Sequence, residues 1–476
     1  MNKIVKNYIY NFAYQIFVLL VPVVTAPYLS RTLGASNLGI YSYVSSSTSI
    51  IQTISLLGIY TYGNRQTAYL RGDKEAINRN FWEIMFIRLL LSGIGTVVYF
   101  VYAQLTEYSS FFLLYYPYIL ANFIDCSWLF VGMEDMKPAV VKNFFAKFAG
   151  VICIFLFVHE RDDTAIYIFI LAISTFVPNI LIYKNLKKYI FSPQINITNL
   201  SRHLKGSVNL FLPEIASLIY LQMDKIMLEW ITGDTAQISY YDQAGKLVTI
   251  PLTIITVLST VLMPRIAAEY KDNERKHINN LINKAGVFSL FLAFPMMFGL
   301  ASIADKLIPW YLGNEFIPTI YAMIFLSPLV LLNTLTGLSG TQYFTATDQI
   351  NIIMKAYISA AISNLILNTI LIPVYGYIGA AIATVFANLI SAIIQYKFFC
   401  EQINLKPLIR PSIKYLVISI IMVFVIRIMT RNMAAYPITT ILQIIIGIVV
   451  YIGANIIIKD PIIRLLKYKF KFMKYK

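Results

Sequence analysis

The chain has 476 residues, of which 58% are hydrophobic and 13% charged, and its formal net charge is +16. So few charged side chains cannot cover a soluble globule of this size, which excludes an ordinary soluble protein and indicates that the bilayer is the solvent. The positive charge does not indicate nucleic-acid binding, because no polar segment is long enough to form a soluble domain with a groove.

Apolar stretches follow one another along the chain, each close to the ~20 residues that a helix needs to cross a bilayer. They predict about fourteen membrane-spanning helices, at residues 8–29, 39–59, 81–104, 111–131, 140–158, 164–184, 207–231, 240–263, 284–304, 316–340, 351–372, 376–400, 408–428 and 437–458. The longest inner connection, 185–206, is short, and the chain contains no G-x-x-x-x-G-K-[ST] phosphate loop, so we expect no ATPase. We predict an all-α integral membrane protein.

The positions of Lys and Arg predict its orientation, because these residues are retained on the cytoplasmic side. With a cytoplasmic start, most of the 39 Lys and Arg residues fall in inner segments. The outer segments hold only Arg31, Arg161, Lys306, Arg427 and Arg431. We therefore expect both termini in the cytoplasm, and anionic headgroups explain the basic fringe.

Two glycine turns suggest an internal repeat. Residues 33–42 (LGASNLGIYS) and 231–241 (ITGDTAQISYY) each place a turn before a tyrosine that enters an inward-running helix. An even number of helices separates them, so the halves would share one orientation. We predict two pseudo-symmetric six-helix bundles, at 1–206 and 207–400, followed by two helices and a basic tail at 401–476.

Polar side chains form stripes on several predicted spans. The stripes repeat at helical spacing on Ser45, Ser49 and Gln52, and on Thr384, Asn388, Ser391 and Gln395. Such groups either hydrogen-bond neighbouring helices or line a polar cavity, and several stripes together favour the cavity.

Charged residues within spans are costly unless they are paired or hydrated, and so mark candidate sites. We single out Arg88, Asp125, Glu214, Asp224, Lys225, Glu229, Asp242 and Lys246. Asp242 and Lys246 lie one turn apart on one face, where they form either an intrahelical pair or a cavity cation with a carboxylate that tunes it. Asp224 and Lys225 are either a structural ion pair or part of the same polar site. The three cysteines and three histidines show no metal-ligand spacing, so we expect no metal and no cofactor.

At this point the residues resemble a known family. The segment 125–137 (DCSWLFVGMEDMK), followed by Lys142-Asn143, resembles a helix signature of bacterial polysaccharide flippases in the multidrug and oligosaccharidyl-lipid exporter superfamily. Further matching pieces are PYLSRTLG at 27–34, Gly58 with Arg65 and Ala68, DKI at 224–226, Tyr241 with Ala244 and Lys246, MPR at 263–265, and Asn368 to Ala380. Val131 and Ser239 depart from the pattern, where the family commonly has glutamine and glycine.

The resemblance implies a fourteen-helix transporter that moves a polyprenyl-diphosphate-linked sugar unit from the cytoplasmic to the outer leaflet of the bacterial inner membrane. Candidate diphosphate-binding cations are Arg31, Arg65, Arg88, Lys225 and Lys246. Candidate carboxylates for ion coupling or charge tuning are Asp125, Glu214, Asp224 and Asp242. Expected partners are the lipid-linked glycan, membrane lipids and a polysaccharide polymerase; no enzymatic activity is expected. A cation-coupled multidrug exporter of the same superfamily and a membrane-embedded polymerase are the alternatives.

Overall fold

The computed structural model describes residues 3–271 and 275–464, so the basic tail predicted beyond residue 464 lies outside the described residues. All fourteen predicted spans fall on helical segments, and three of them, 39–59, 111–131 and 316–340, also include an internal turn or break. Ten of the described helical segments are long and apolar enough to cross a membrane. The prediction of an all-α membrane protein is confirmed.

The chain divides into two compact units, residues 1–239 and 240–476. The α-helices of the first unit are α1 (Lys3–Thr32), α2 (Gly34–Leu56), α3 (Ile59–Tyr69), α4 (Lys74–Gln104), α5 (Ser109–Phe123), α6 (Ser127–Gly132), α7 (Lys137–Phe157), α8 (Thr164–Leu181) and α9 (Ile197–Thr232). Short 3₁₀ segments at Arg161–Asp163 and Ile182–Lys188 flank α8. Helix α10 (Thr235–Lys271) contains the division.

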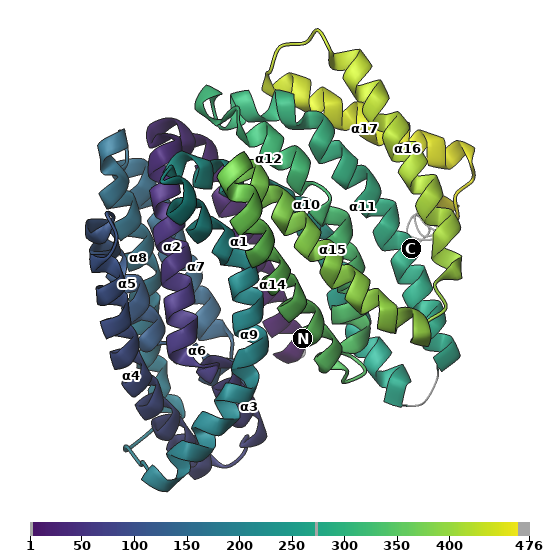
Figure 1. Ribbon diagram of the computed structural model, residues 1–476. Coiled ribbons are helices and arrows are strands. Elements are labelled where there is room, and N and C mark those ends of the chain that lie inside the picture. The colour runs from purple at the N-terminus through teal and green to yellow at the C-terminus, as the bar shows by residue number, and fades with distance from the viewer. Residues whose placement is uncertain (1–2, 272–274, 465–476) are drawn as a thin grey trace. The chain divides into compact units, whose positions relative to one another are not determined.

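Helix α9 belongs to the first unit because it packs against α2, α3 and α4 (Figure 1). The other main contacts of this unit join α5 to α8, and α7 to α8 and α1. The sequence repeat places a boundary within α9, at residue 206, whereas the contacts place one after this helix, at residue 239. The boundaries at 206 and 400 describe the internal repeat and not the compact units, and they stay a prediction.

The second unit continues with α11 (Arg275–Tyr311), a 3₁₀ turn (Asn314–Phe316), α12 (Thr319–Leu326), α13 (Leu329–Thr336), a π-helical turn (Gly337–Phe344), α14 (Ile350–Tyr375), α15 (Tyr377–Gln402), α16 (Lys406–Thr430) and α17 (Pro437–Ile457). Helices α14 and α15 pack together, and α16 and α17 both pack on α11 (Figure 1). A buried aromatic core of Phe291, Tyr415 and Tyr451 joins these last three helices.

Two predicted continuous spans are wrong in detail. The predicted span 111–131 ends at Phe123 and resumes at Ser127, because side chains from other helices bind the carbonyls at its centre. The predicted span 316–340 is interrupted at Pro328, which lacks the N–H that a continuous helix needs.

Helix α3 is a short helix in a segment that the sequence assigns to an inner loop. The chain turns into it through Leu57 and Gly58, both in the left-handed region, with φ of 45° and 74°. A Cβ on Gly58 would lie 2.8 Å from the carbonyl oxygen of Ser207 on α9. Glycine is therefore required here both for its backbone angle and for close packing.

Within each unit, segments predicted on the same side of the membrane meet. In the first unit, Asn37 donates to the carbonyl of Arg161 (2.9 Å) at the predicted outer end. In the second unit, Lys306 donates to the carbonyl of Met433 (2.6 Å) at the predicted outer end, and Asn283 donates to that of Asn404 (3.0 Å) at the predicted inner end. The helix directions agree with the sequence, and the choice of which end is cytoplasmic still rests on the Lys and Arg distribution.

Candidate functional site

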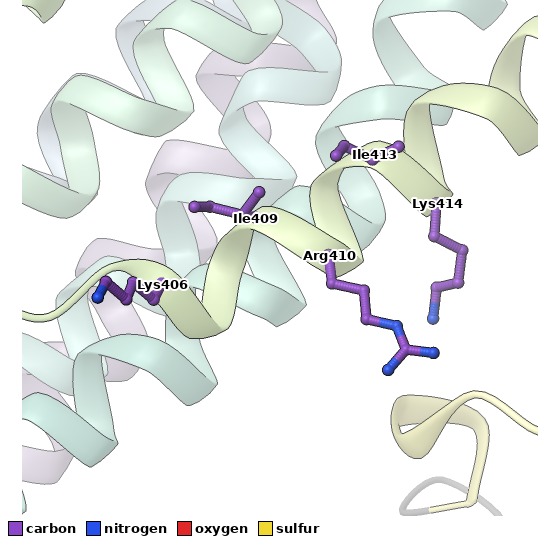
Figure 2. Close-up of a pocket in the computed structure, with 5 residues that line it drawn as sticks. All are labelled: Lys406, Ile409, Arg410, Ile413 and Lys414. Carbon is purple, nitrogen blue, oxygen red and sulfur yellow. The ribbon is translucent and has the colours of Figure 1, made fainter.

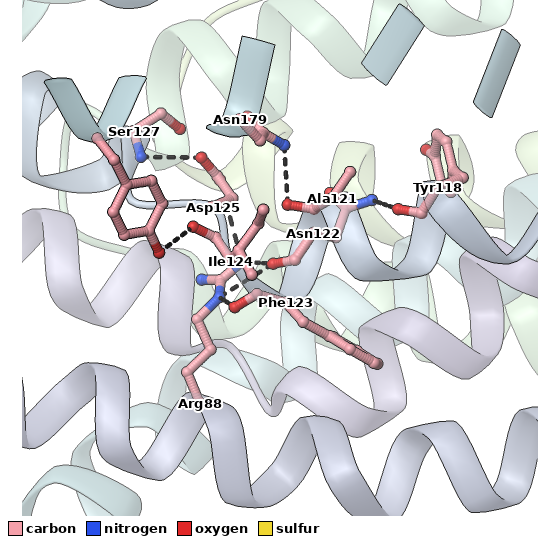
Figure 3. A network of polar contacts seen from close by, with 10 residues as sticks. Arg88, Tyr118, Ala121, Asn122, Phe123, Ile124, Asp125, Ser127 and Asn179 are labelled. Atoms are coloured by element: carbon pink, nitrogen blue, oxygen red, sulfur yellow. Dashed lines mark hydrogen bonds and ion pairs between the residues drawn. The ribbon is translucent and has the colours of Figure 1, made fainter. Parts of the chain in front are cut away.

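Arg88 occupies the gap between α5 and α6 (Figure 3). Its side chain comes from α4 and is buried, with 1% exposed. Nε donates to the carbonyls of Asn122 (3.0 Å) and Phe123 (3.1 Å), and Nη2 also donates to Asn122. These carbonyls end a helix and lack the usual partner one turn further on, so the guanidinium takes that place.

Asp125 lies beside this guanidinium at the same break. One carboxylate oxygen accepts a hydrogen bond from the backbone N–H of Ser127 (2.8 Å), and the other lies 3.9 Å from Arg88 Nη2. Arg88 has five N–H donors, of which those on Nη1 have no hydrogen-bond partner among the described residues. The pair therefore fixes the helix break, and most of the guanidinium is committed to protein atoms.

A second buried network, which the sequence analysis missed, joins α3, α4 and α9. Glu83 Oε2 lies 2.8 Å from His203 Nε2, and the Tyr62 hydroxyl lies 2.9 Å from His203 Nδ1. The other Glu83 oxygen accepts from the backbone N–H of Asn196 (3.2 Å) and the side chain of Asn199 (3.0 Å). Glu83 lies within a predicted span, and an ionisable residue within a span is the sequence signal that could have identified this network.

The donors and acceptors of this network are complementary. Burial raises the pKa of the Tyr62 hydroxyl, which therefore keeps its proton, and this hydroxyl shares a hydrogen bond with Nδ1 of His203. The Glu83 carboxylate can only accept, so Nε2 of His203 donates to it. The network attaches the first turns of α9 to α3 and α4. Further along, α9 carries Asp224 and Lys225.

The charges of α9 have different surroundings. Asp224 is buried, Lys225 is half-buried and Glu214 is exposed. Glu229 accepts a hydrogen bond from the Tyr108 hydroxyl (3.0 Å). Two residues before Asp224, Gln222 accepts a hydrogen bond from the Ser46 hydroxyl of α2 (2.9 Å). Hydrogen bonds therefore join α9 to other parts of the first unit at several points along its length.

In the second unit, Asp242 and Lys246 form the predicted pair on α10. Lys246 Nζ lies 2.7 Å from Asp242 Oδ2; the aspartate side chain is 8% exposed and the lysine side chain 42% exposed. The carboxylate is thus held inside the protein while the ammonium reaches outward. The neighbouring Tyr241 hydroxyl bonds Thr384 of α15 (2.9 Å).

The polar stripe of α15 is a structural one. All four of its members are buried, and Gln395 accepts a hydrogen bond from Ser339 (2.8 Å) while its amide donates to Ser391 (3.3 Å). On α2, Ser45 and Ser49 bond carbonyls of their own helix. The interpretation of the stripes as cavity lining is therefore wrong for α15, where they join helices.

The remaining candidate cations lie at the surface. Arg31, in the last turn of α1, is exposed and donates to the carbonyl of Pro27 (2.7 Å). Arg65 of α3 is exposed, with its guanidinium 5.9 Å from the ring centre of Tyr69. Two pairs of candidate residues are in contact, Arg88 with Asp125 and Lys246 with Asp242.

Comparison with known proteins identifies the family. The family described as polysaccharide biosynthesis protein matches residues 4–269, more than half of the chain. The chain belongs to this family. A relative in Escherichia coli (strain K12), named as an O-antigen transporter, is 25% identical over 392 residues, covering 79% of this chain and 92% of the relative.

Solved structures of transporters share the fold of this chain. A structure of the lipid II flippase MurJ, in an inward closed conformation, covers 96% of this chain and 100% of its own, with a TM-score of 0.73 and 20% identity. An inward-facing multidrug resistance transporter of the MATE family covers 80% of this chain and 93% of its own, with a TM-score of 0.65 and 14% identity. The resemblance to the polysaccharide biosynthesis family is confirmed, and the chain shares its fold with these two structures.

Proposed function

We propose that this protein is a flippase that moves polyprenyl-diphosphate-linked oligosaccharide units from the cytoplasmic to the outer leaflet for cell-surface polysaccharide synthesis. The observation that carries the proposal is family membership. The relative named as an O-antigen transporter, matched over most of both chains, and the fold shared with a lipid II flippase support it. These relatives are transporters by name, and we propose no enzymatic activity for this chain.

The physical task requires polar groups inside the membrane. A diphosphate and its sugars cannot cross hydrocarbon unaided, because each unpaired polar group costs several kcal/mol there. Alternating access would expose a polar site first to the cytoplasm and then to the outside, while the polyprenyl tail stays in lipid. Such a site needs cations for the diphosphate, because charge-assisted hydrogen bonds to phosphate are the strong ones.

Lys246 is our first candidate for that cation. Its ammonium group is half-exposed and its charge is balanced by one buried carboxylate, Asp242, which keeps it oriented. Arg31, Arg65 and Lys225 are the further candidates. Arg88 enters the proposal as a positioning residue, because its donors bind the carbonyls that end α5.

Asp125, Glu214, Asp224 and Asp242 remain proposed groups for ion coupling or for tuning the cations. We place both termini in the cytoplasm and the protein in the bacterial inner membrane, with a polysaccharide polymerase as its partner. These assignments rest on the Lys and Arg distribution and on the implied pathway.

The proposal is tested in cells depleted of this protein. Extracted lipids are analysed by mass spectrometry, and an impermeant glycan-modifying enzyme is applied to intact spheroplasts. We expect a lipid-linked sugar unit to accumulate and to be shielded from the enzyme. Accumulation in the exposed leaflet would instead indicate a polymerase, and no accumulation would favour the multidrug exporter.

Replacing the proposed cation tests the site. We expect Lys246→Gln, supplied in the depleted cells, to leave the lipid-linked unit shielded while its expression and membrane insertion stay normal. Lys397→Gln removes an exposed cation of α15 in the same unit and is the matched control. Full export by Lys246→Gln would assign the Asp242 pair a structural role only.

A further inference from the structure

Three cationic residues line a hollow at the first turns of α16. Lys406, Arg410 and Lys414 surround it together with Ile409 and Ile413, and its volume is ≈ 680 Å³ (Figure 2). Residues four apart lie on one face of a helix, with a rise of about 6 Å between them. The three cations therefore form a row along one face, over the end of the helix predicted to lie at the cytoplasmic surface.

Two of these cations have no ion-pair partner among the described residues. Lys414 pairs with Asp460, which also accepts hydrogen bonds from the Tyr415 hydroxyl (3.1 Å) and the backbone N–H of Ile462 (2.8 Å). Lys406 and Arg410 are exposed and form no recorded salt bridge in residues 3–271 and 275–464. Among the described residues, the hollow therefore carries two positive charges that no carboxylate balances.

An apolar face continues from the hollow along α16. Ile409 and Ile413 are each 57% exposed, although they lie between the cations. Further exposed apolar side chains follow at helical spacing, namely Val417, Ile421, Phe424 and Ile428. A soluble anion would use the cations and leave this face uncovered. A ligand with an anionic head and acyl chains would use both parts.

We infer that this hollow binds the headgroup phosphate of an anionic membrane phospholipid, whose acyl chains lie along the apolar face of α16. Basic residues at a membrane surface attract anionic lipids, and guanidinium and ammonium groups both bind phosphate oxygens. Lys414, held by Asp460, fixes one side of the hollow, and Lys406 and Arg410 supply the uncompensated charge. The site is separate from the proposed transport cation on α10.

The test uses the full-length protein in mild detergent, titrated with phosphatidylglycerol and followed by native mass spectrometry. Phosphatidylcholine and glycerol 3-phosphate are the comparison probes. The variant Lys406→Gln/Arg410→Gln leaves the Lys414 pair intact. The control Lys355→Gln/Lys397→Gln removes two exposed cations from α14 and α15 of the same unit.

We expect the parental protein to retain phosphatidylglycerol in preference to phosphatidylcholine, and high salt to reduce that preference. The double variant should bind phosphatidylglycerol about thirtyfold more weakly, which is ~2 kcal/mol at ~1 kcal/mol per cation. The control variant should bind as the parental protein does. Arg410→Lys keeps the positive charge and should retain most of the binding. It therefore shows whether the loss in the double variant is due to the missing charge.

Three results would overturn the inference. Equal phosphatidylglycerol binding by the double variant and the parental protein would show that the hollow is not the site. An equal loss in the control variant would show that only the total charge matters. Displacement of the lipid by an equal concentration of glycerol 3-phosphate would assign the hollow to a soluble phosphate compound. The melting temperature of each variant is measured first, and the single variants Lys406→Gln and Arg410→Gln replace the double variant if that one unfolds.

Discussion

Replacing Arg88 by leucine separates a structural role of this arginine from a direct role in transport. The guanidinium lies in the break between α5 and α6, where it donates to the carbonyls of Asn122 and Phe123 and lies 3.9 Å from the Asp125 carboxylate. Leucine is apolar and shorter than arginine, and it has no donor. Both carbonyls and the carboxylate would then be left in a buried, low-dielectric region.

The expected loss of stability is several kcal/mol. A buried acceptor without a donor costs ~1–3 kcal/mol, and removal of one partner of a buried ion pair costs ~3–5 kcal/mol. These costs overlap because the same guanidinium serves all three groups, so we expect a total of about 3–5 kcal/mol. Asp125→Asn should cost less, ~1–2 kcal/mol, because its side chain can still accept from Ser127 and Arg88 keeps both carbonyls.

The assay is thermal unfolding of the purified protein in detergent. For a chain of 476 residues, a loss of this size corresponds to a decrease in melting temperature of about 3–5 °C. Arg65→Leu is the matched control, because Arg65 is exposed and its recorded contact is with the ring of Tyr69, and it should change the melting temperature by no more than about 2 °C.

A structural role of Arg88 is refuted by an unchanged melting temperature together with a loss of transport. If Arg88→Leu melts at the parental temperature but no longer moves the lipid-linked unit, Arg88 contacts the substrate directly. The helix break is then held by other groups, such as the Tyr183 hydroxyl that donates to the Ile124 carbonyl (2.7 Å).

Two further substitutions test the packing of the first unit. Glu83→Ala should lower the melting temperature by several degrees because His203 loses its acceptor, whereas Glu83→Gln should lower it less; equal melting of both variants and the parent would contradict the buried network. Gly39→Val should prevent recovery of monodisperse protein, because even a Cβ would lie 1.8 Å from the Thr235 carbonyl oxygen. Gly93→Ala, with open space around it, is the control and should behave as the parent; normal recovery of Gly39→Val would show that the α2 contact is looser.

The helices were predictable because a bilayer demands long apolar segments, and each predicted span falls on a helical segment. Helix α3 was not predictable, because its polar residues Asn64 to Gln66 resemble those of a connecting loop. The break after Phe123 was not predictable either. It depends on Arg88, Asn179 and Tyr183, which are far away in the sequence and bind the carbonyls at that point (Figure 3).

Contacts of the candidate site were predictable where both residues lie close together in the sequence. The contact between Asp242 and Lys246 follows from their spacing of four on one helix. The role of the α15 stripe was not predictable, since the spacing gives the face but not the helix that covers it. Glu83 and His203 are 120 residues apart, so only the fold reveals that they meet.

The central claim, that this protein moves a lipid-linked oligosaccharide across the membrane, is tested most directly with purified components. The protein is reconstituted into vesicles that contain polyprenyl-diphosphate-linked oligosaccharide in both leaflets, and an impermeant glycosidase is added outside. Protein-free vesicles should yield only the outer half of the substrate. We predict that vesicles with this protein yield nearly all of it and that Lys246→Gln vesicles yield about half. Cleavage that stops at half with the parental protein would contradict the account.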